Sequence, residues 1–296
     1  MTILVGVDPA HRSASALHLA AMLARSSGQD LLVAAVVPPA WPASAGGADA
    51  EWRGYTRDTA NGALDHAAAV LGGQARAEYL LQEAPSARRG LVELAEQREA
   101  SLIVVGSGVS GHPGRIALGS ESDALLHASP IPVAIAPSGY RTEDDARIGR
   151  VTAAYRGTGA STGLVLGAAK VAAMLDAELR IASFAVVPRD SGTSGAGLDA
   201  ELPIADAWAA DIERHAAAVV SQVTELPDAP AVSGVAVGIG ESWESALADI
   251  DWEPEEVLVV GSSTLGAIAR VFLGSHAAKI VRHSPVPVVV VPHGRE

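Results

Sequence analysis

The same stretch of sequence occurs twice in this chain of 296 residues. Nearly the whole of residues 102–137 recurs at residues 258–292, with glycines, prolines and an arginine in register. The matching pairs, each separated by 155 positions, are Gly106 and Gly261, Gly111 and Gly266, Arg115 and Arg270, Gly119 and Gly274, Ser120 and Ser275, Pro130 and Pro285, Pro132 and Pro287, and Pro137 and Pro292. An ungapped match of this length is not expected from composition alone, so the sequence predicts two copies of one domain.

Each copy is predicted to be an α/β domain with a doubly wound, Rossmann-like parallel sheet of five strands. In the first copy, short apolar runs rich in β-branched residues are separated by segments with helical spacing. We expect strands at residues 2–7, 31–37, 77–81, 102–105 and 131–136, and helices at residues 13–26, 58–71, 86–98 and from 119 or 120 to 128. Strands without apolar–polar alternation are typical of a parallel sheet covered on both faces.

The second copy repeats this order. We expect strands at residues 151–154, 179–187, 232–237, 257–260 and 286–291, and helices at residues 204–223, 242–250 and from 274 or 275. Stretches rich in Gly, Pro and Ser predict loops at residues 38–54, which include Trp41 and Trp52, and at residues 188–203. The domains are therefore predicted at residues 1–137 and 151–292, joined by a charged linker at residues 138–150.

A glycine-rich turn joins a buried strand to a helix in each copy. It begins at Gly106 or Gly261, and the helix begins at Gly119-Ser120 or Gly274-Ser275. The start of a helix has unpaired backbone N–H groups and a partial positive charge, which suit an anionic phosphate group. The turn is therefore a candidate phosphate site, in which the serine hydroxyl could cap the helix or contact a phosphate oxygen.

Tight packing alone also explains such a turn. Glycine is needed wherever two backbones approach closely, and the serine can be a helix N-cap with no ligand. The turns lack the lysine of a Walker A motif, and no G-x-G-x-x-G follows the first strand. Glycine spacing by itself leaves the packing and phosphate interpretations open.

The charge balance argues against nucleic acid and membrane surfaces as partners. The formal net charge is −13, and polyanions are bound chiefly through Lys and Arg. The sequence has no cysteine, and no apolar run approaches the roughly 20 residues that cross a bilayer. We expect a soluble cytoplasmic protein.

The turn and the residues after it resemble the C-terminal signature of the universal stress protein family. In that family a glycine is followed by two residues, a second glycine, nine residues, and then glycine with serine or threonine. The outer glycines keep this spacing in both copies, whereas Val109 and Thr264 stand at the place of the second glycine. The resemblance covers nearly the whole chain and implies a fold similar to the adenine nucleotide alpha hydrolases.

The resemblance implies an ATP site, with or without Mg²⁺, in the first copy. In the family, an aspartate at the end of the first strand contacts the nucleoside, and an apolar residue at the end of the second strand lines the adenine pocket. Asp8 and Val36 match these positions, and Ser122 is the second serine of the helix. Asp8 before Pro9 is also a common turn-forming residue, and we favour its functional role because the signature turn is present as well.

The second copy is expected to be the weaker ATP site. Val186 is expected at the place of Val36, but Tyr155 stands where we expect the counterpart of Asp8, and Ala277 replaces Ser122. A tyrosine cannot accept ribose hydrogen bonds as a carboxylate does. In the family the proline-flanked terminal strands pair across a dimer, so here the two copies are expected to form an internal pseudo-dimer, with a further homodimer left open.

Three functions remain open at this point. The first is a stress-response regulator that is not an enzyme, in which ATP occupancy is the signal for a protein partner that the sequence does not name. The second is a slow Mg²⁺-dependent ATPase, against which stands the absence of a Walker lysine, of a metal-ligand cluster and of a G-x-S-x-G motif. The third is an interaction module without nucleotide, which the departures at Val109, Thr264 and Tyr155 favour.

Overall fold

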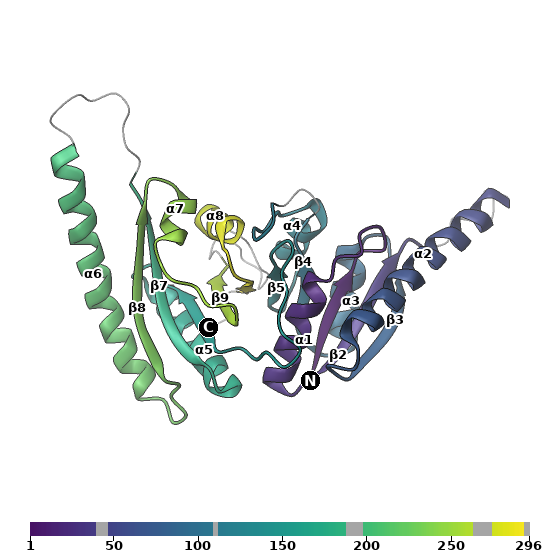
Figure 1. The fold of residues 1–296 in the computed structure, drawn as a ribbon, viewed down its shortest axis with the longest axis horizontal. Coiled ribbons are helices and arrows are strands. Elements are labelled where there is room, and N and C mark those ends of the chain that lie inside the picture. The colour runs from purple at the N-terminus through teal and green to yellow at the C-terminus, as the bar shows by residue number, and fades with distance from the viewer. Residues whose placement is uncertain (40–46, 109–111, 188–197, 263–273, 293–296) are drawn as a thin grey trace. The chain divides into compact units, whose positions relative to one another are not determined.

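A computed structural model describes residues 1–39, 47–108, 112–187, 198–262 and 274–292 (Figure 1). The chain divides into two compact units, the first built mainly from Met1–Arg147 and the second mainly from Ile148–Gly261. Figure 1 shows the same order of strands and helices in both units. The predicted duplication of a doubly wound α/β domain is confirmed.

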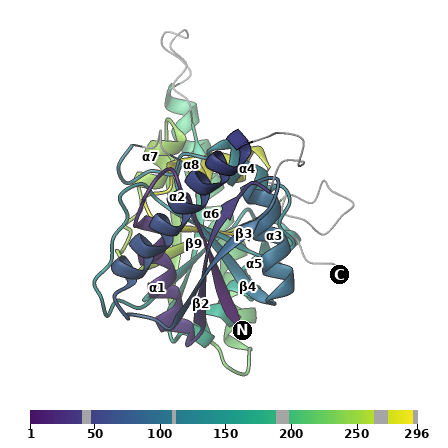
Figure 2. The same ribbon diagram turned by 90° about the vertical axis from the view of Figure 1, so that its right-hand side faces the viewer.

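The first unit has five parallel strands in the order β3-β2-β1-β4-β5. Its elements are β1 (Thr2–Val7), α1 (Ser15–Ser27), β2 (Asp30–Val37), α2 (Gly47–Leu71), β3 (Ala77–Glu83), α3 (Ala87–Gln97), β4 (Ala100–Gly106), α4 (Ser120–Leu126) and β5 (Val133–Ala136). Helix α1 packs on α2, and α3 packs on α4. Figure 2 shows α1 and α3 on opposite sides of β2, so helices cover both faces of the sheet, as in other parallel sheets.

The second unit repeats this arrangement. Its elements are β6 (Arg150–Ala154), α5 (Gly159–Leu175), β7 (Glu178–Val186), α6 (Leu198–Thr224), β8 (Val232–Gly240), α7 (Trp243–Ala248), β9 (Glu256–Gly261) and α8 (Ser275–His283), and the last strand of the second copy is β10 (Val288–Val291). Strands β9, β6, β7 and β8 are parallel neighbours in that order, and β10 lies next to β9. Helix α5 packs on α6, and α7 packs on α8.

Strand register shows which residues of the two units occupy the same place. Ile3 on β1 pairs with Leu102 on β4, and Val151 on β6 pairs with Val257 on β9. Leu102 and Val257 lie one repeat of 155 positions apart, so Val151 takes the place of Ile3. The two units can therefore be compared residue by residue along their central strands.

The helix ends that follow support this alignment. Helix α1 ends at Gly28 and α5 at Asp176, and both residues have the left-handed backbone conformation, with φ of 67° and 54°. This conformation favours glycine, and aspartate is among the few other residues that adopt it without a large cost. The turn between the first helix and the second strand therefore has the same geometry in both units.

Charged side chains are buried near the N-terminal edge of the second sheet. Glu256, the fully buried first residue of β9, accepts hydrogen bonds from Arg180 (2.6 Å, Nη2 to Oε1) and from Arg150 (2.7 Å, Nη2 to Oε2). The Thr152 hydroxyl donates to Glu256 and accepts from Arg180 Nε at 3.0 Å. The guanidinium of Arg180 also lies 4.8 Å from the centre of the Trp252 ring. Burial lowers the pKa of Arg180, and the Glu256 charge acts in the opposite direction.

The first unit has a different solution at the same three places. Strand register puts Leu4 and Leu32 where the second unit has Thr152 and Arg180. Ser101 lies one repeat of 155 positions before Glu256, at a shift in the pairing of β1 with β4. Leu4 and Leu32 belong to the apolar core. The same part of the sheet is therefore filled by apolar leucines in the first unit and by a hydrogen-bonded ion network in the second.

The structure corrects two predicted loops and adds a helix. Helix α2 begins at Gly47, so residues 47–54 are helical and Trp52 lies on a helix; Trp41 is outside the described residues. Helix α6 begins at Leu198, within the predicted loop at residues 188–203. In both segments Gly and Pro indicate a loop, but the Ala, Glu and Leu residues that favour a helix outweigh them. Helix α5 was not predicted.

Each part of the segment at residues 138–150 is hydrogen-bonded within the unit to which it belongs. Arg25 Nε on α1 donates to the Ala146 carbonyl at 3.0 Å, and Gln74 Nε2 donates to Asp144 Oδ1 at 2.5 Å. The Gly149 amide donates to the Glu255 carbonyl at 3.0 Å. Its predicted role as a linker stays a prediction. None of the helices in the described ranges is both long and apolar enough to cross a bilayer.

Candidate functional site

The candidate site of each unit lies where the order of the strands reverses direction. From β1 the chain proceeds to β2 and β3 on one side, and then crosses to β4 and β5 on the other. In open α/β sheets, ligands bind beyond the carboxyl ends of the two strands at such a point. These strands are β1 and β4 in the first unit, and β6 and β9 in the second.

Asp8 directly follows β1, and its side chain is 58% exposed. Its Oδ1 accepts a hydrogen bond from the Ala10 amide at 2.8 Å, and its Oδ2 lies 2.9 Å from Nδ1 of His11. Asp8 is therefore a turn-forming residue, as one of the two interpretations predicted. A carboxylate has about four acceptor positions, so these two contacts leave capacity for a ligand hydroxyl.

Hydrogen bonds join the start of the glycine-rich turn after β4 to the residues that lead into α4. The Gly108 amide donates to the Ala117 carbonyl at 2.7 Å, and the Ala117 amide donates to the Ser107 hydroxyl at 2.8 Å. A Cβ atom on Gly108 would lie 3.1 Å from the Gly119 nitrogen, so any other residue would require the returning backbone to move by a few tenths of an ångström. Gly111 of the predicted site, together with Val109, lies outside the described residues.

Glycine, and not serine, caps the helix after the turn. Gly119 is the N-cap of α4 with no side-chain hydrogen bond, and Ser120 is the first helical residue. The predicted capping role of Ser120 is therefore wrong, because Ser120 lies one position after the N-cap. Contact of its hydroxyl with a phosphate stays a prediction. Ser122 is half-buried in the same first turn, which also holds Glu121.

Val36 lies at the end of β2, beside the first turn of α3. A Cβ atom on Gly90 of α3 would lie 2.9 Å from Val36 Cγ1, so the glycine lets the helix approach the valine side chain. Val36 remains half-buried, with part of its surface open at the carboxyl edge of the sheet. Its side chain is placed where the resemblance predicts an adenine contact, and that contact stays a prediction.

Replacing Gly108 by alanine is expected to open the turn. The added methyl group meets backbone atoms of Gly119 and Ala117, which cannot rotate away. Overpacking of this kind costs about 1–3 kcal/mol, which corresponds to roughly tenfold to hundredfold faster hydrogen exchange of the Ala117 amide. The same substitution at Gly54, where an added methyl group would have no neighbouring atom within 4 Å, should leave this exchange unchanged. Unchanged exchange in Gly108→Ala would show that the turn is not closed by this approach.

Arg156, and not Tyr155, occupies the place of Asp8 in the second unit. Because Val151 takes the place of Ile3, the residue equivalent to Asp8 is Arg156, which is exposed. Tyr155 is 5% exposed, and its backbone pairs with β7 through a 2.8 Å bond from its amide to the Ala182 carbonyl. The predicted substitution of tyrosine for the acidic residue is therefore wrong: Tyr155, directly after β6, is still buried and hydrogen-bonded to β7, and the exposed position comes one residue later.

The same register corrects the apolar position on β7. Ile3 pairs with Leu31 and Val151 pairs with Leu179, so the counterpart of Val36 is Phe184 and not Val186. The Phe184 ring stacks on Trp252 with 6.4 Å between ring centres. The prediction of Val186 aligned β2 and β7 by their carboxyl ends. Because β7 is longer than β2, that alignment does not follow the pairing of the strands.

Helix α8 of the second unit begins with a glycine N-cap and a basic, aromatic surface. Gly274 is the N-cap with no side-chain hydrogen bond, and Ser275 is the first helical residue, so the predicted capping role of Ser275 is wrong for the same reason as that of Ser120. His276 meets Trp243 of α7 edge to face with 5.6 Å between ring centres, and Lys279 Nζ lies 5.8 Å from the centre of that ring. Burial lowers the pKa of His276, as do the nearby charges of Arg156 and Lys279.

The glycines of the second turn are partly described. Gly261 ends β9, and a Cβ atom there would lie 3.4 Å from Leu164, which is a tight but ordinary packing distance. Gly266, Thr264 and Arg270 lie outside the described residues. Within the described ranges, no group of three or more His, Asp or Glu side chains is arranged to hold a metal ion.

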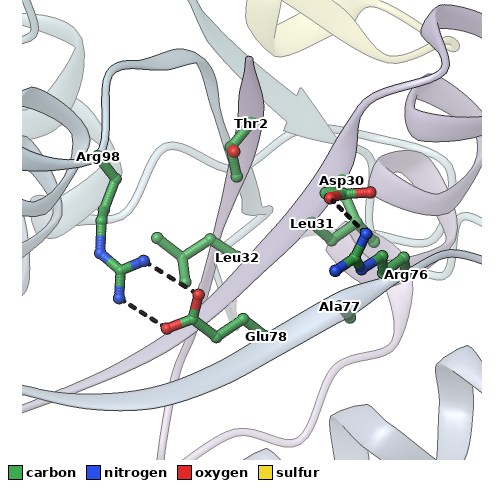
Figure 3. A pocket seen from close by; sticks show the side chains of 8 residues that line it. All are labelled: Thr2, Asp30, Leu31, Leu32, Arg76, Ala77, Glu78 and Arg98. Atoms are coloured by element: carbon green, nitrogen blue, oxygen red, sulfur yellow. Dashed lines mark hydrogen bonds and ion pairs between the residues drawn. The ribbon is translucent and has the colours of Figure 1, made fainter.

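Cavities occur at the opposite edge of each sheet. In the first unit a cavity of about 390 Å³ opens at the starts of β1, β2 and β3 (Figure 3). Its charged residues are paired: Arg98 makes two hydrogen bonds to Glu78, of 3.0 and 2.6 Å, and Arg76 lies 3.9 Å from Asp30. A cavity of about 310 Å³ lies at the corresponding edge of the second unit. Neither includes any predicted site residue.

Comparison with known proteins identifies the family. The model of the universal stress protein family matches residues 1–137 and 147–292. The chain belongs to the universal stress protein family. Each of the two matches is to one universal stress protein domain.

Relatives of both lengths are known. Universal stress protein Rv2319c of Mycobacterium tuberculosis (strain ATCC 25618 / H37Rv) is 36% identical, over 99% of this chain and 100% of its own. The crystal structure of a universal stress protein from Archaeoglobus fulgidus DSM 4304 has a TM-score of 0.60 at 20% identity, over 99% of this chain and 98% of its own. A shorter universal stress protein, solved in complex with cAMP, is 28% identical over 47% of this chain and 98% of its own, with a TM-score of 0.36.

Proposed function

We propose that the protein is a nucleotide-binding regulator in which the first unit binds ATP, and in which occupancy of that site is the signal. The observation that carries the proposal is the convergence at the switch point of the first sheet. An exposed carboxylate, Asp8, stands at the end of β1, and Ser107 and Gly108, which are hydrogen-bonded to Ala117, stand at the end of the neighbouring strand β4. Such a pairing of an acceptor with a glycine turn suits the two ends of a nucleotide.

Each part of the site has a chemical role in this proposal. The triphosphate would lie against the backbone amides of the turn and of the first turn of α4, with the hydroxyls of Ser120 and Ser122 as further donors. Asp8 would accept hydrogen bonds from ribose hydroxyls. Val36, half-buried at the end of β2, would contact the adenine ring.

Negative charge close to the turn makes a divalent cation part of the proposal. Glu121 and Asp123 lie in the first turn of α4, and Glu121 Oε2 accepts a hydrogen bond from the Arg88 amide at 3.3 Å. These carboxylates and the net charge of −13 oppose a triphosphate. We therefore expect ATP to bind with Mg²⁺, which would neutralise part of the phosphate charge.

Replacing Asp8 by alanine is expected to weaken ATP binding by roughly tenfold, because hydrogen bonds to a charged group contribute about 1.5–3 kcal/mol. Isothermal titration of the full chain with ATP and Mg²⁺ measures the dissociation constant. Asp65→Ala removes an exposed carboxylate on α2 and serves as the matched control, with unchanged affinity expected. Equal affinity of the Asp8→Ala and parent proteins would contradict the assignment of Asp8 to the nucleotide.

Two further observations separate this proposal from its alternatives. Adenine nucleotide released from the purified protein on denaturation, identified by mass spectrometry, would argue against an interaction module that works without nucleotide. ADP that accumulates from ATP and Mg²⁺, and no longer does so in Ser120→Ala, would replace occupancy by slow hydrolysis as the function. The pairing of the terminal strands across the two copies, a further homodimer, a protein partner and a cytoplasmic location stay predictions.

A further inference from the structure

The carboxyl edge of the second sheet carries the opposite charge to that of the first. At the end of the first strand, Asp8 of the first unit is replaced by Arg156. In the first turn of the helix after the glycine-rich turn, one repeat of 155 positions later, Glu121 is replaced by His276. Lys279 follows on the same helix, where the first unit has Ala124. Two acidic positions have become basic, and a further cation has been added.

This exchange changes what the second unit can bind. A carboxylate accepts hydrogen bonds from ribose hydroxyls, whereas a guanidinium has five N–H donors and no acceptor. Arginine is also positively charged at every physiological pH, and its planar donors match the oxygens of a phosphate group. The group that faces Arg156 must therefore be an acceptor, and an anionic one is favoured.

The three basic residues lie at the carboxyl edge of the second sheet, Arg156 directly after β6 and the other two on α8, the helix that follows β9. Arg156, His276 and Lys279 are exposed and come from two separate elements. The charges of Arg156 and Lys279 both reach His276 and, together with burial, lower the pKa of its imidazole. Positive charges held together in this way repel each other, and an anion bound between them would remove that cost.

An aromatic ring completes the surface. Trp243, the first residue of α7, is half-buried; the His276 ring packs against it edge to face, and Lys279 lies over it. In the first unit, α3 and the first turn of α4 are joined by a hydrogen bond from the Arg88 amide to Glu121. The helix pair is kept in both units, but in the second it presents an indole ring and cations instead of a carboxylate.

We propose that Arg156, His276 and Lys279 form a binding site for the phosphate groups of a small polyanionic ligand, separate from the nucleotide site of the first unit. Arg156 would bind one phosphate at the end of β6, and His276 and Lys279 would bind at the start of α8. Two permanent cations match a ligand with at least two negative charges. Trp243 forms an apolar wall beside these groups.

Inorganic triphosphate is the direct probe, titrated into the full chain by calorimetry at low ionic strength, where interactions of exposed charges are least screened. Arg156→Gln and Lys279→Gln are each expected to weaken binding roughly tenfold, since each removes a charged partner of the phosphate. Lys170→Gln, which removes the same charge from an exposed position on α5, is the matched control and should bind as the parent does. Binding should also be retained in Gly108→Ala, which alters the turn of the first unit.

A second readout follows His276 itself. Because a bound phosphate opposes the repulsion from Arg156 and Lys279, the imidazole should titrate at higher pH with triphosphate present, as measured by NMR. Repeating the calorimetry with ATP and with adenosine distinguishes a nucleotide from free polyphosphate as the source of the phosphates, since both phosphate compounds should depend on Arg156. The proposal is overturned if triphosphate does not bind, if Arg156→Gln and Lys279→Gln bind as Lys170→Gln does, if Gly108→Ala abolishes binding, or if adenosine binds with the same dependence on Arg156.

Discussion

Replacing Glu256 by alanine is expected to lower the free energy of unfolding of the second unit by about 3–5 kcal/mol, the cost of removing one partner of a buried ion pair. Glu256 is fully buried and accepts hydrogen bonds from Arg150, Arg180 and Thr152. Without it, the buried guanidinium of Arg180 keeps its positive charge with no carboxylate beside it. Arg150 loses less, because it also pairs with Glu253 at 2.8 Å.

The chain supplies its own control for this prediction. The triple variant Thr152→Leu, Arg180→Leu, Glu256→Ser installs the residues that the first unit has at these places. Replacing a whole buried ion network by apolar residues is often neutral or stabilising, so the triple variant should lose less stability than Glu256→Ala. Hydrogen exchange of the β6 and β7 amides measures this unit separately from the other. A Glu256→Ala protein as stable as the parent would mean that the ion network contributes little to the stability of the second unit.

Replacing Gly238 by alanine is expected to displace α7 and to lower the free energy of unfolding by about 1–3 kcal/mol or more, as overpacking does. A Cβ atom at Gly238 on β8 would overlap the carbonyl oxygen of Ala246, which is part of the backbone of α7. A backbone atom cannot move aside as the end of a side chain can, so the helix itself must shift. Because α7 begins with Trp243, the ring contact with His276 should be lost as well.

The same substitution at a second glycine should have the opposite effect. Gly167 lies on α5, and a Cβ atom there would have no neighbour within 4 Å. Alanine is favoured over glycine inside a helix by about 1 kcal/mol, so Gly167→Ala should raise the melting temperature while Gly238→Ala lowers it. Calorimetry of the two variants and the parent measures the rise and the fall of the melting temperature in one experiment. A Gly238→Ala protein that melts with the parent would show that α7 does not rest directly on β8.

The fold could be predicted because its signals repeat. The duplicated glycines and prolines, and the short apolar runs that end at glycine, indicate the same strand and helix order twice. The predicted strand at residues 2–7 coincides with β1. The long helices were harder, since Gly47–Leu71 and Leu198–Thr224 begin in segments whose glycines and prolines suggested loops.

The site of the second unit could not be predicted correctly, because local pattern does not define register. Tyr155 follows an apolar run and resembles the first residue after a strand, yet it is buried, and the exposed position belongs to Arg156. Phe184 and Val186 were confused in the same way, since strands of unequal length match by their pairing partners and not by their ends. The partners of Glu256 lie on two other strands, β6 and β7, and an acidic residue at the start of an apolar run does not reveal them.

The replacement of Asp8 by Arg156 has a consequence for how such a protein can evolve. In an assembly of identical subunits, every mutation is present in every copy. A substitution that improves binding of a new ligand therefore weakens binding of the old ligand in all subunits. A gene that encodes both modules in one polypeptide escapes this restriction and fixes their stoichiometry at one to one. One unit can then keep its original ligand while the other unit diverges, so that one polypeptide could bind two different ligands.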